Sequence, residues 1–243
     1  MPERNASWSD RLRAASLEDI APFALLALIA ALIAGFGRIA GEIVSGDTYA
    51  FDETLLRALR NPADPTDPIG PAWLEHVMRD ITSLGSFTVI IALILVVAGY
   101  LVIDGKYRTA AFTVAATGGG IVLSEILKAL FARPRPDLVA HLVDVQSMSF
   151  PSGHAMLSAV TFLTLGALLT RVQSRRRLKI YIVSVAILLT LLVGASRVYL
   201  GVHWPTDVLA GWCAGASWAI GCWLLERWLQ ARGRIEPPDG NFG

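Results

Sequence analysis

Apolar residues gather into six long runs along the chain, separated by shorter polar segments. A helix that crosses a bilayer needs about 20 predominantly apolar residues, and each run approaches that length. The runs cover residues 20–39, 86–103, 109–131, 154–170, 178–194 and 207–229. The pattern predicts an all-α, polytopic membrane protein, with six transmembrane helices in one bundle and a single membrane domain over residues 1–243. The first run is longer than the apolar part of a signal peptide and is expected to stay uncleaved.

The connection over residues 41–85 has a different pattern, with eight acidic residues and four prolines. Apolar positions recur at helical spacing around residues 52–60 and again around residues 71–82, as in helices that lie in a membrane interface. We therefore expect two short interfacial helices, separated by a rigid Pro-rich turn. The sequence leaves open whether this connection takes part in substrate access or only covers the bundle.

Composition agrees with a membrane protein. Hydrophobic residues make up 54% of the chain and charged residues 17%, against roughly 45–50% and about 25% in ordinary soluble domains. A formal charge of +1 gives no indication of nucleic-acid binding. Cys213 and Cys222 are nine residues apart in one helical run, about 13 Å, which is too far for a disulfide. No pattern of metal ligands or nucleotide loops is present, so we expect neither a metal nor a cofactor.

Lysine and arginine near the membrane ends predict the orientation, because they favour the cytoplasmic side. With alternating helices, both termini and two connections share one basic side, and Arg38 is the exception at the other side. The connections 41–85, 132–153 and 195–206 then face the periplasm or the extracellular side, as expected of a bacterial inner-membrane protein. The basic positions are Arg4, Arg11, Arg13, Lys106, Arg108, Arg171, Arg175, Arg176, Arg177, Lys179, Arg232 and Arg234.

Three motifs lie on the side opposite the basic connections. Their charged, hydroxyl and imidazole groups are the types that phosphoryl transfer requires: cations for the phosphate oxygens, a nucleophile and an acid for the leaving group. The positions are Lys128, Arg135 and Pro136 in the first motif, Pro151, Ser152, Gly153 and His154 in the second, and Ser196, Arg197, His203 and Asp207 in the third.

The spacing within the motifs supports this chemistry. Ser152 and Gly153 open the fourth apolar run, where the first N–H groups of a helix bind anions. His203 and Asp207 are four residues apart, so a carboxylate can face the imidazole and hold one ring nitrogen protonated. The other nitrogen is then available as a nucleophile. The residues alone do not distinguish the roles of His154 and His203.

The order K-x6-RP, PSGH and SR-x5-H-x3-D resembles the signature of the type 2 phosphatidic acid phosphatase superfamily, over a catalytic core of about residues 86–229. The resemblance implies a lipid phosphatase with His203 as nucleophile, His154 as general acid and base, and Asp207 as partner of His203. It also implies a phosphate or pyrophosphate monoester of a membrane lipid as substrate, such as phosphatidic acid, phosphatidylglycerol phosphate or undecaprenyl pyrophosphate. No metal, nucleic acid or obligate protein partner is implied. The substrate-binding residues implied are Lys128, Arg135, Pro136, Ser152, Gly153, Ser196 and Arg197.

Other functions remain open at this point. A phosphotransferase would pass the phosphoryl group from His203 to a hydroxyl group instead of water. A haloperoxidase of related fold would hold vanadate, but six spanning helices argue against it. A transporter or headgroup-binding protein would not require both histidines, Asp207 and three spaced cations.

Several further polar and aromatic residues have no place in the motifs. Glu125 lies inside a spanning run, so we expect it to pair with Lys128 or to be protonated. Arg133 either contacts a substrate headgroup or anchors its loop. The remaining expectations are an aromatic belt at Trp204 and Trp212, a close helix crossing at Gly118, Gly119 and Gly120, and surface positions for His76 and His141.

Overall fold

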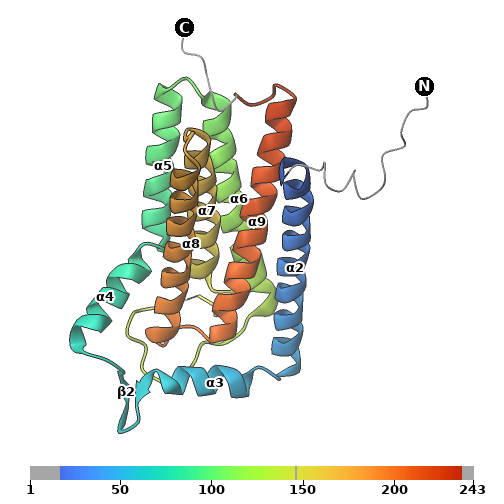
Figure 1. Ribbon diagram of the computed structural model, residues 1–243. Coiled ribbons are helices and arrows are strands. Elements are labelled where there is room, and N and C mark those ends of the chain that lie inside the picture. The colour runs from blue at the N-terminus through green and yellow to red at the C-terminus, as the bar shows by residue number, and fades with distance from the viewer. Residues whose placement is uncertain (1–16, 146, 237–243) are drawn as a thin grey trace, which may run out of the picture.

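The computed structural model describes residues 17–145 and 147–236, and within these ranges six long helices stand side by side as a bundle (Figure 1). The N-terminal end of α2 and the C-terminal end of α9 lie at the same end of the bundle. The basic residues Arg4, Arg11 and Arg13 lie outside the described ranges. The long helices are α2 (Leu17–Ser45), α5 (Phe87–Ile103), α6 (Tyr107–Phe131), α7 (Gly153–Arg171), α8 (Arg176–Tyr199) and α9 (Pro205–Ala231).

The spanning helices agree with the predicted fold class. Five helices of the described chain are long and apolar enough to cross a membrane. The sixth, α5, has 17 residues, and it passes the same test together with α4 (Ala72–Ser83), from which it is bent by 49°. The all-α membrane fold is therefore confirmed, with helix ends that extend beyond the predicted ones, most of all in α2 and α8.

Helix α7 lies at the centre of the bundle, with α9 packed closely along it. Gly211 and Gly215 of α9 lie four residues apart and face α7. A Cβ atom at Gly211 would lie 2.8 Å from the carbonyl oxygen of Ser152, and one at Gly215 would lie 2.5 Å from that of Met156. Small residues at this spacing let two membrane helices approach closely. The contact brings the first turn of α9 beside the first turn of α7.

The predicted glycine crossing on α6 is present at two of its three positions. Gly119 lies against the ring of Trp218 and Gly120 against Val160, whereas Gly118 has nothing within 4 Å of its Cβ position. The Trp218 indole N–H also donates to the carbonyl of Ala116 at 2.8 Å. Close contacts with α6 therefore fix the positions of both α7 and α9 relative to that helix.

The aromatic belt is wrong at Trp204, and at Trp212, which is half-buried, it stays a prediction. Trp204 is buried, and its indole N–H donates to the carbonyl of Pro134 at 3.1 Å. The indole of Trp212 donates to the carbonyl of Thr190 at 3.1 Å and packs on Gly194 of α8. Both rings find carbonyl partners inside the protein, because glycine and an irregular loop leave room for them there.

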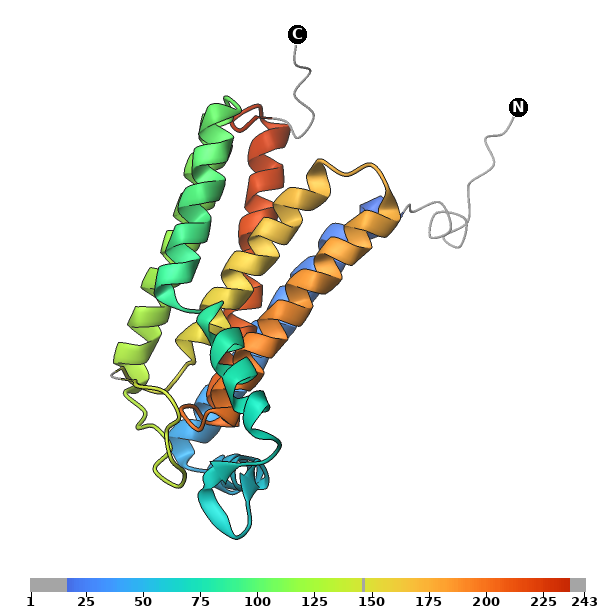
Figure 2. The same ribbon diagram turned by 90° about the vertical axis from the view of Figure 1, so that its left-hand side faces the viewer.

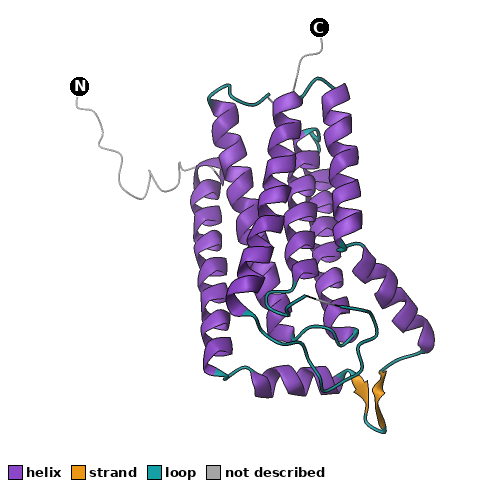
Figure 3. Cartoon of the chain, turned by 180° about the vertical axis from the view of Figure 1, so that it is seen from behind, coloured by secondary structure: helices purple, strands orange, loops and turns teal. Residues whose placement is uncertain are grey.

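The connection over residues 41–85 contains α3 (Tyr49–Ala58) and α4, close to the two predicted helices. The segment between them is a small antiparallel hairpin of β1 (Arg60–Asn61) and β2 (Asp64–Pro68), not the predicted Pro-rich turn (Figure 3). The hairpin tolerates Pro65 and Pro68 because β2 has only one neighbouring strand, so its other edge needs no N–H donors.

This connection packs on the helix ends (Figure 2). Leu56 of α3 is fully buried and contacts a cluster that includes Trp204 and Val208. Arg60 donates to the carbonyl of Tyr199 at 2.9 Å, and the Tyr199 hydroxyl donates to the carbonyl of Ile69 at 2.9 Å. The segment 41–85 is thus joined to the C-terminal end of α8 by hydrogen bonds in both directions.

Candidate active site

The three motifs meet at the end of the bundle that α3 covers. Their residues come from the C-terminal ends of α6 and α8, the N-terminal ends of α7 and α9, the loop over residues 132–152 and the connection over residues 200–204, which contains His203. Gly201, with φ of +75°, turns the chain sharply between α8 and α9. A left-handed residue at this turn carries little strain only when it is glycine.

His203 lies fully buried between Asp207 and Arg135. Its Nδ1 atom is 3.3 Å from Asp207 Oδ2, and its Nε2 atom is 3.1 Å from a guanidinium nitrogen of Arg135. A carboxylate only accepts hydrogen bonds and a guanidinium only donates them. The proton of a neutral ring therefore sits on Nδ1, and the lone pair of Nε2 points toward Arg135.

The surroundings of His203 favour the neutral ring. Burial holds the pKa of His203 well below its ordinary value of 6.5, and the positive charges of Arg197, Arg135 and Lys128 act in the same direction. A ring that is not protonated at neutral pH keeps its Nε2 lone pair available. The site thus supplies the form of histidine that a nucleophile needs.

Lys128 and Arg135 converge on one serine of the loop. The ammonium group of Lys128 donates to the hydroxyl of Ser147 at 2.9 Å. Arg135 donates to the same hydroxyl at 3.1 Å and to the carbonyls of Ser147 and Val202 at 2.8 and 2.6 Å. The two cations share a neutral hydroxyl, and among the described residues only the largely exposed Glu125, 4.0 Å from Lys128, lies within ion-pair distance of either. Much of their positive charge is therefore available to an anion.

Arg197 is the third cation and is 3% exposed. One guanidinium nitrogen donates to the hydroxyl of Thr82 in α4 at 3.0 Å. Its Nε atom has no hydrogen-bond partner in the described part of the chain, and neither do the buried hydroxyls of Ser124 and Ser152. Buried polar groups without partners are rare, and a ligand is one of the usual reasons for them.

The N-terminal end of α7 contributes backbone donors. Among the described residues, the N–H groups of Gly153 and His154 make no hydrogen bond outside the helix, whereas the N–H of Ser152 donates to the carbonyl of Asp207 at 3.0 Å. The prediction that the Ser152 N–H is a phosphate donor is therefore not supported. A Cβ atom at Gly153 would lie 3.2 Å from the ammonium of Lys128, so glycine gives this lysine its place.

His154 follows as the second residue of α7 and is partly exposed. Its backbone packs on Gly85, at the junction of α4 and α5. No hydrogen bond of the described residues engages its ring. A partly open imidazole beside the cations has the access that a proton donor to a leaving group requires.

Two motif residues, Ser196 and Pro136, have partners away from the cations, whereas Glu125 lies beside Lys128 as one expectation had it. The hydroxyl of Ser196 donates to the carbonyl of Val193 at 2.6 Å within its own helix. Pro136 is buried, and its carbonyl accepts from the exposed His141 at 2.6 Å. The carboxylate of Glu125 is 68% exposed and 4.0 Å from the ammonium of Lys128. Pairing of Glu125 with Lys128 is thus the alternative that the geometry favours.

Arg133 anchors its loop and does not face a headgroup, since it is 3% exposed and ion-paired to Asp52 and Asp207. Sequence reasoning missed Asp52, as well as Ser149, whose hydroxyl donates to Asp207 Oδ2 and lies 3.4 Å from His203 Nδ1. Ser149 lies two residues before the motif residue Pro151, and this proximity is a signal that the sequence offers. Asp52 had none, because it is one of several acidic residues in its segment.

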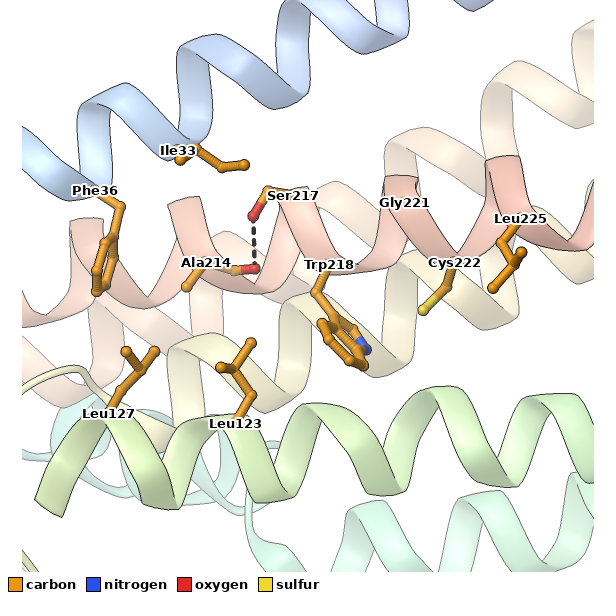
Figure 4. A pocket seen from close by; sticks show the side chains of 10 residues that line it. All are labelled: Ile33, Phe36, Leu123, Leu127, Ala214, Ser217, Trp218, Gly221, Cys222 and Leu225. Atoms are coloured by element: carbon orange, nitrogen blue, oxygen red, sulfur yellow. Dashed lines mark hydrogen bonds between the residues drawn. The ribbon is translucent and has the colours of Figure 1, made fainter. Parts of the chain in front are cut away.

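The cavities between the helices have a different character. One of about 490 Å³ lies between α2, α6 and α9 and is lined by residues such as Phe36, Leu123 and Trp218 (Figure 4). Another of about 590 Å³ lies between α2, α7, α8 and α9. None of their lining residues is charged, so these cavities suit lipid chains and not phosphate chemistry. Within the described residues, no group of three His, Cys, Asp or Glu side chains is placed to hold a metal ion.

The model of the PAP2 superfamily matches residues 89–231. Phosphatidylglycerophosphatase B of Bacillus subtilis (strain 168) is 36% identical over 183 residues, which cover 73% of this chain and 84% of that protein. The undecaprenyl-diphosphatase of Sulfolobus acidocaldarius is 40% identical over 103 residues, which cover 40% of this chain and 45% of that protein.

The fold is also similar to those of two solved membrane proteins. The crystal structure of a transmembrane PAP2-type phosphatidylglycerolphosphate phosphatase from Bacillus subtilis superposes with a TM-score of 0.74 at 30% identity, covering 83% of this chain and 96% of that chain. LpxE of Aquifex aeolicus superposes with a TM-score of 0.53 at 25% identity, covering 74% of this chain and 96% of that chain.

Proposed function

The chain belongs to the PAP2 superfamily and is a membrane lipid phosphatase, and on this basis we propose that it works through a phosphohistidine intermediate on His203. The observation that carries the proposal is the position of His203 between Asp207 on Nδ1 and Arg135 on Nε2, with the positive charges of Arg197 and Lys128 near enough to act on the ring. A neutral, oriented imidazole beside clustered positive charge is suited to attack a phosphorus atom.

We further propose a glycerophospholipid phosphate monoester as substrate, with phosphatidylglycerol phosphate as the first to be tested. Support comes from the relative matched over 84% of its length, which is named a phosphatidylglycerophosphatase. The match to an undecaprenyl-diphosphatase covers only 45% of that protein, so a diphosphate substrate ranks second.

In the first step, the Nε2 lone pair of His203 attacks the phosphorus atom and the bond from phosphorus to the leaving oxygen breaks. His154 gives a proton to that oxygen, and the lipid alcohol departs. Lys128, Arg135 and Arg197 bind the nonbridging oxygens and stabilise their charge. The ring of His203 becomes cationic, and the carboxylate of Asp207 stabilises it.

In the second step, a water molecule attacks the phosphorus atom and gives its proton to His154, which now acts as a base. The bond from phosphorus to Nε2 breaks, inorganic phosphate leaves and His203 returns to its neutral form. His154 is again protonated for the next cycle. The residues thus complete a hydrolysis in which atoms and protons balance.

We also propose that the site faces away from the cytoplasm. Lys106, Lys179, Arg232 and Arg234 lie at the opposite end of the bundle from the site, as the bias of basic residues to the cytoplasmic side requires. A cysteine in place of the exposed Asp144, in a chain with Cys213 and Cys222 replaced by alanine, would then react with an impermeant thiol reagent added outside intact cells. Labelling only after lysis would overturn the orientation.

Phosphate release by the purified protein tests the proposed function. The wild type is compared with His203→Ala and with a control, His76→Ala, which removes an exposed histidine on α4. Phosphatidylglycerol phosphate, phosphatidic acid, undecaprenyl pyrophosphate and a soluble phosphate ester are each assayed with and without EDTA.

We expect turnover by the wild type and by His76→Ala, and a loss of about 10⁴-fold or more in His203→Ala, because a covalent route loses its nucleophile. Turnover that persists in EDTA would support a route without metal. Equal turnover by His203→Ala would contradict the phosphohistidine route. Activity only in the presence of an alcohol acceptor would favour phosphoryl transfer over hydrolysis.

A further inference from the structure

Asp52, in α3, is fully buried although it belongs to a connection that was expected to lie at the membrane surface. Its carboxylate accepts a hydrogen bond from Arg133 at 2.7 Å on Oδ2. It also accepts from the backbone N–H of Thr206 at 2.9 Å and from the Thr206 hydroxyl at 2.6 Å. A buried charge is retained only when it is paired and hydrogen-bonded, and Asp52 is both.

Arg133 continues this chain of contacts toward the site. One guanidinium nitrogen donates to Asp52, and the other donates to Asp207 Oδ1 at 2.6 Å and to the Thr206 hydroxyl at 2.8 Å. The planar guanidinium group has donors in fixed directions, so it fixes the two carboxylates relative to each other. Asp52 and Asp207 come from segments 155 residues apart in sequence, and Arg133 joins them.

The contact with Arg133 fixes the orientation of the Asp207 carboxylate. With Oδ1 held by Arg133, the other oxygen, Oδ2, accepts from the backbone N–H of Trp204 at 3.0 Å and from Ser149, and faces His203 Nδ1 at 3.3 Å. A rotation of the carboxylate would break the contact with Arg133. Arg133 therefore sets the angle at which Asp207 meets the imidazole.

From these contacts we propose that Asp52 and Arg133 are a pair of positioning residues for His203, which act by holding the carboxylate of Asp207 on the Nδ1 side of the ring. The proposal rests on the proposed function of His203. It assigns a role to the segment 41–85, which lies outside the region matched by the family model, residues 89–231.

The charges explain why Arg133 needs a second carboxylate. Bound to Asp207 alone, a buried guanidinium would neutralise the charge that has to stabilise the cationic ring of the phosphohistidine. Asp52 neutralises part of the positive charge of Arg133. More of the negative charge of Asp207 is therefore available to stabilise the ring of His203. Asp52 also satisfies the N–H of Thr206, in the first turn of α9, where the helix has no partner of its own.

The first arm of the test measures kcat and KM for Asp52→Asn in the purified full-length protein. We expect kcat to fall by roughly 10–100-fold, as when a residue that orients a functional histidine is removed. KM should change little, because Lys128, Arg135 and Arg197 still bind the phosphate. The control is Glu53→Gln, which makes the same charge change on the adjacent residue of α3, whose side chain is 42% exposed, and should behave as wild type.

A double-mutant cycle tests whether Asp52 acts through Arg133. Arg133→Met removes the guanidinium but keeps an unbranched side chain of similar reach. If Asp52 acts through Arg133, Asp52→Asn lowers kcat much less in the Arg133→Met background than in the wild type. Full additivity of the two effects on kcat would overturn the pairing.

The second arm reads the imidazole directly and does not depend on turnover. Nitrogen chemical shifts of His203, assigned by loss of the signal in His203→Gln, report which ring nitrogen carries the proton. We expect protonated Nδ1 in the wild type and in Glu53→Gln, and a mixture of tautomers in Asp52→Asn. This result would stand even if no tested lipid were hydrolysed, in which case only the proposed function would fail.

An unchanged tautomer in Asp52→Asn would overturn the inference, whether or not kcat fell, because a purely structural role would lower activity without releasing the ring. Unchanged kcat in Asp52→Asn would overturn it as well. If Asp52→Asn did not fold, Thr48→Ala would replace it, since the Thr48 hydroxyl accepts from the same Arg133 nitrogen at 3.3 Å and its loss leaves the carboxylates in place. A smaller shift toward mixed tautomers is then expected, and none would contradict the proposal.

Discussion

Buried charges lie at both ends of the helix bundle, but their balance differs. At one end, Arg171 of α7 and Glu226 of α9 form a closed pair, in which two guanidinium nitrogens each meet one carboxylate oxygen at 2.5 Å. At the other end, Arg135 and Arg197 contact neutral groups, and the described residues place no carboxylate within ion-pair distance of either.

The difference separates a structural contact from a binding site. A guanidinium and a carboxylate that satisfy each other hold two helices together and have nothing left for a ligand. Cations held in place by hydroxyl and carbonyl oxygens keep most of their charge, which is the arrangement that an anionic substrate and its transition state require. A buried arginine is therefore a structural contact when a carboxylate pairs with it, and part of a binding site when none does.

The largest effect is expected from removing a cation at the site. Arg197→Ala should lower kcat/KM by about 10²–10³-fold, the usual result of losing one group that stabilises a transition state. Its thermal midpoint should not fall, because the buried positive charge has no carboxylate to leave unpaired. Steady-state kinetics and thermal unfolding in the same detergent measure both quantities. Arg197→Lys should recover part of the rate, and a large loss of stability in Arg197→Ala would contradict this comparison.

Breaking the closed pair should do the opposite. Glu226→Gln leaves Arg171 as an uncompensated buried charge and should cost about 3 kcal/mol, at the lower end of the range for buried pairs. Activity per folded molecule should stay within about twofold, because the pair lies far from the site. The double variant Arg171→Met/Glu226→Leu should regain most of the thermal midpoint. A loss of kcat in Glu226→Gln at full folding would show that the two ends are coupled.

A smaller effect is expected on pH dependence. Because burial and the nearby cations hold the pKa of His203 well below 6.5, its neutral form persists in mild acid, and the acid limb of kcat/KM from this group lies below pH 6.5. Arg135→Gln removes one positive charge beside Nε2, which makes protonation of the ring less unfavourable. The limb should then move up by roughly one pH unit. Titration of the substrate is the same for both proteins, so an unmoved limb would count against His203.

The sequence was a good guide to the helices and to the motif residues. Long apolar runs leave few alternatives in a membrane, because every backbone group must be satisfied inside its own segment. The spacing of His203 and Asp207 also predicted their contact, although His203 lies just before α9 and Asp207 lies in its first turn. These are short-range patterns, and short-range patterns are what a single sequence displays most directly.

Contacts between distant segments were harder to predict. Asp52 looked like the exposed Asp47 and the half-buried Glu53, and nothing in the local pattern showed that it alone turns toward Arg133. Trp204 was predicted to lie at a membrane interface, but its indole is buried and donates to the carbonyl of Pro134. The hydroxyl of Ser196 sits in a motif, yet it is bound within its own helix. For Asp52 and Trp204 the partner lies in a distant segment, which the residue's own neighbourhood does not reveal.

Trapping the phosphohistidine on His203 would test the proposed mechanism. Rapid mixing with phosphatidylglycerol phosphate labelled in its terminal phosphate, followed by an alkaline quench, preserves a phosphohistidine, which is stable to alkali and labile to acid. We expect transient label on the peptide that contains His203, in wild type and in His76→Ala, and none in His203→Ala. Full turnover without label on that peptide at any quench time would contradict it.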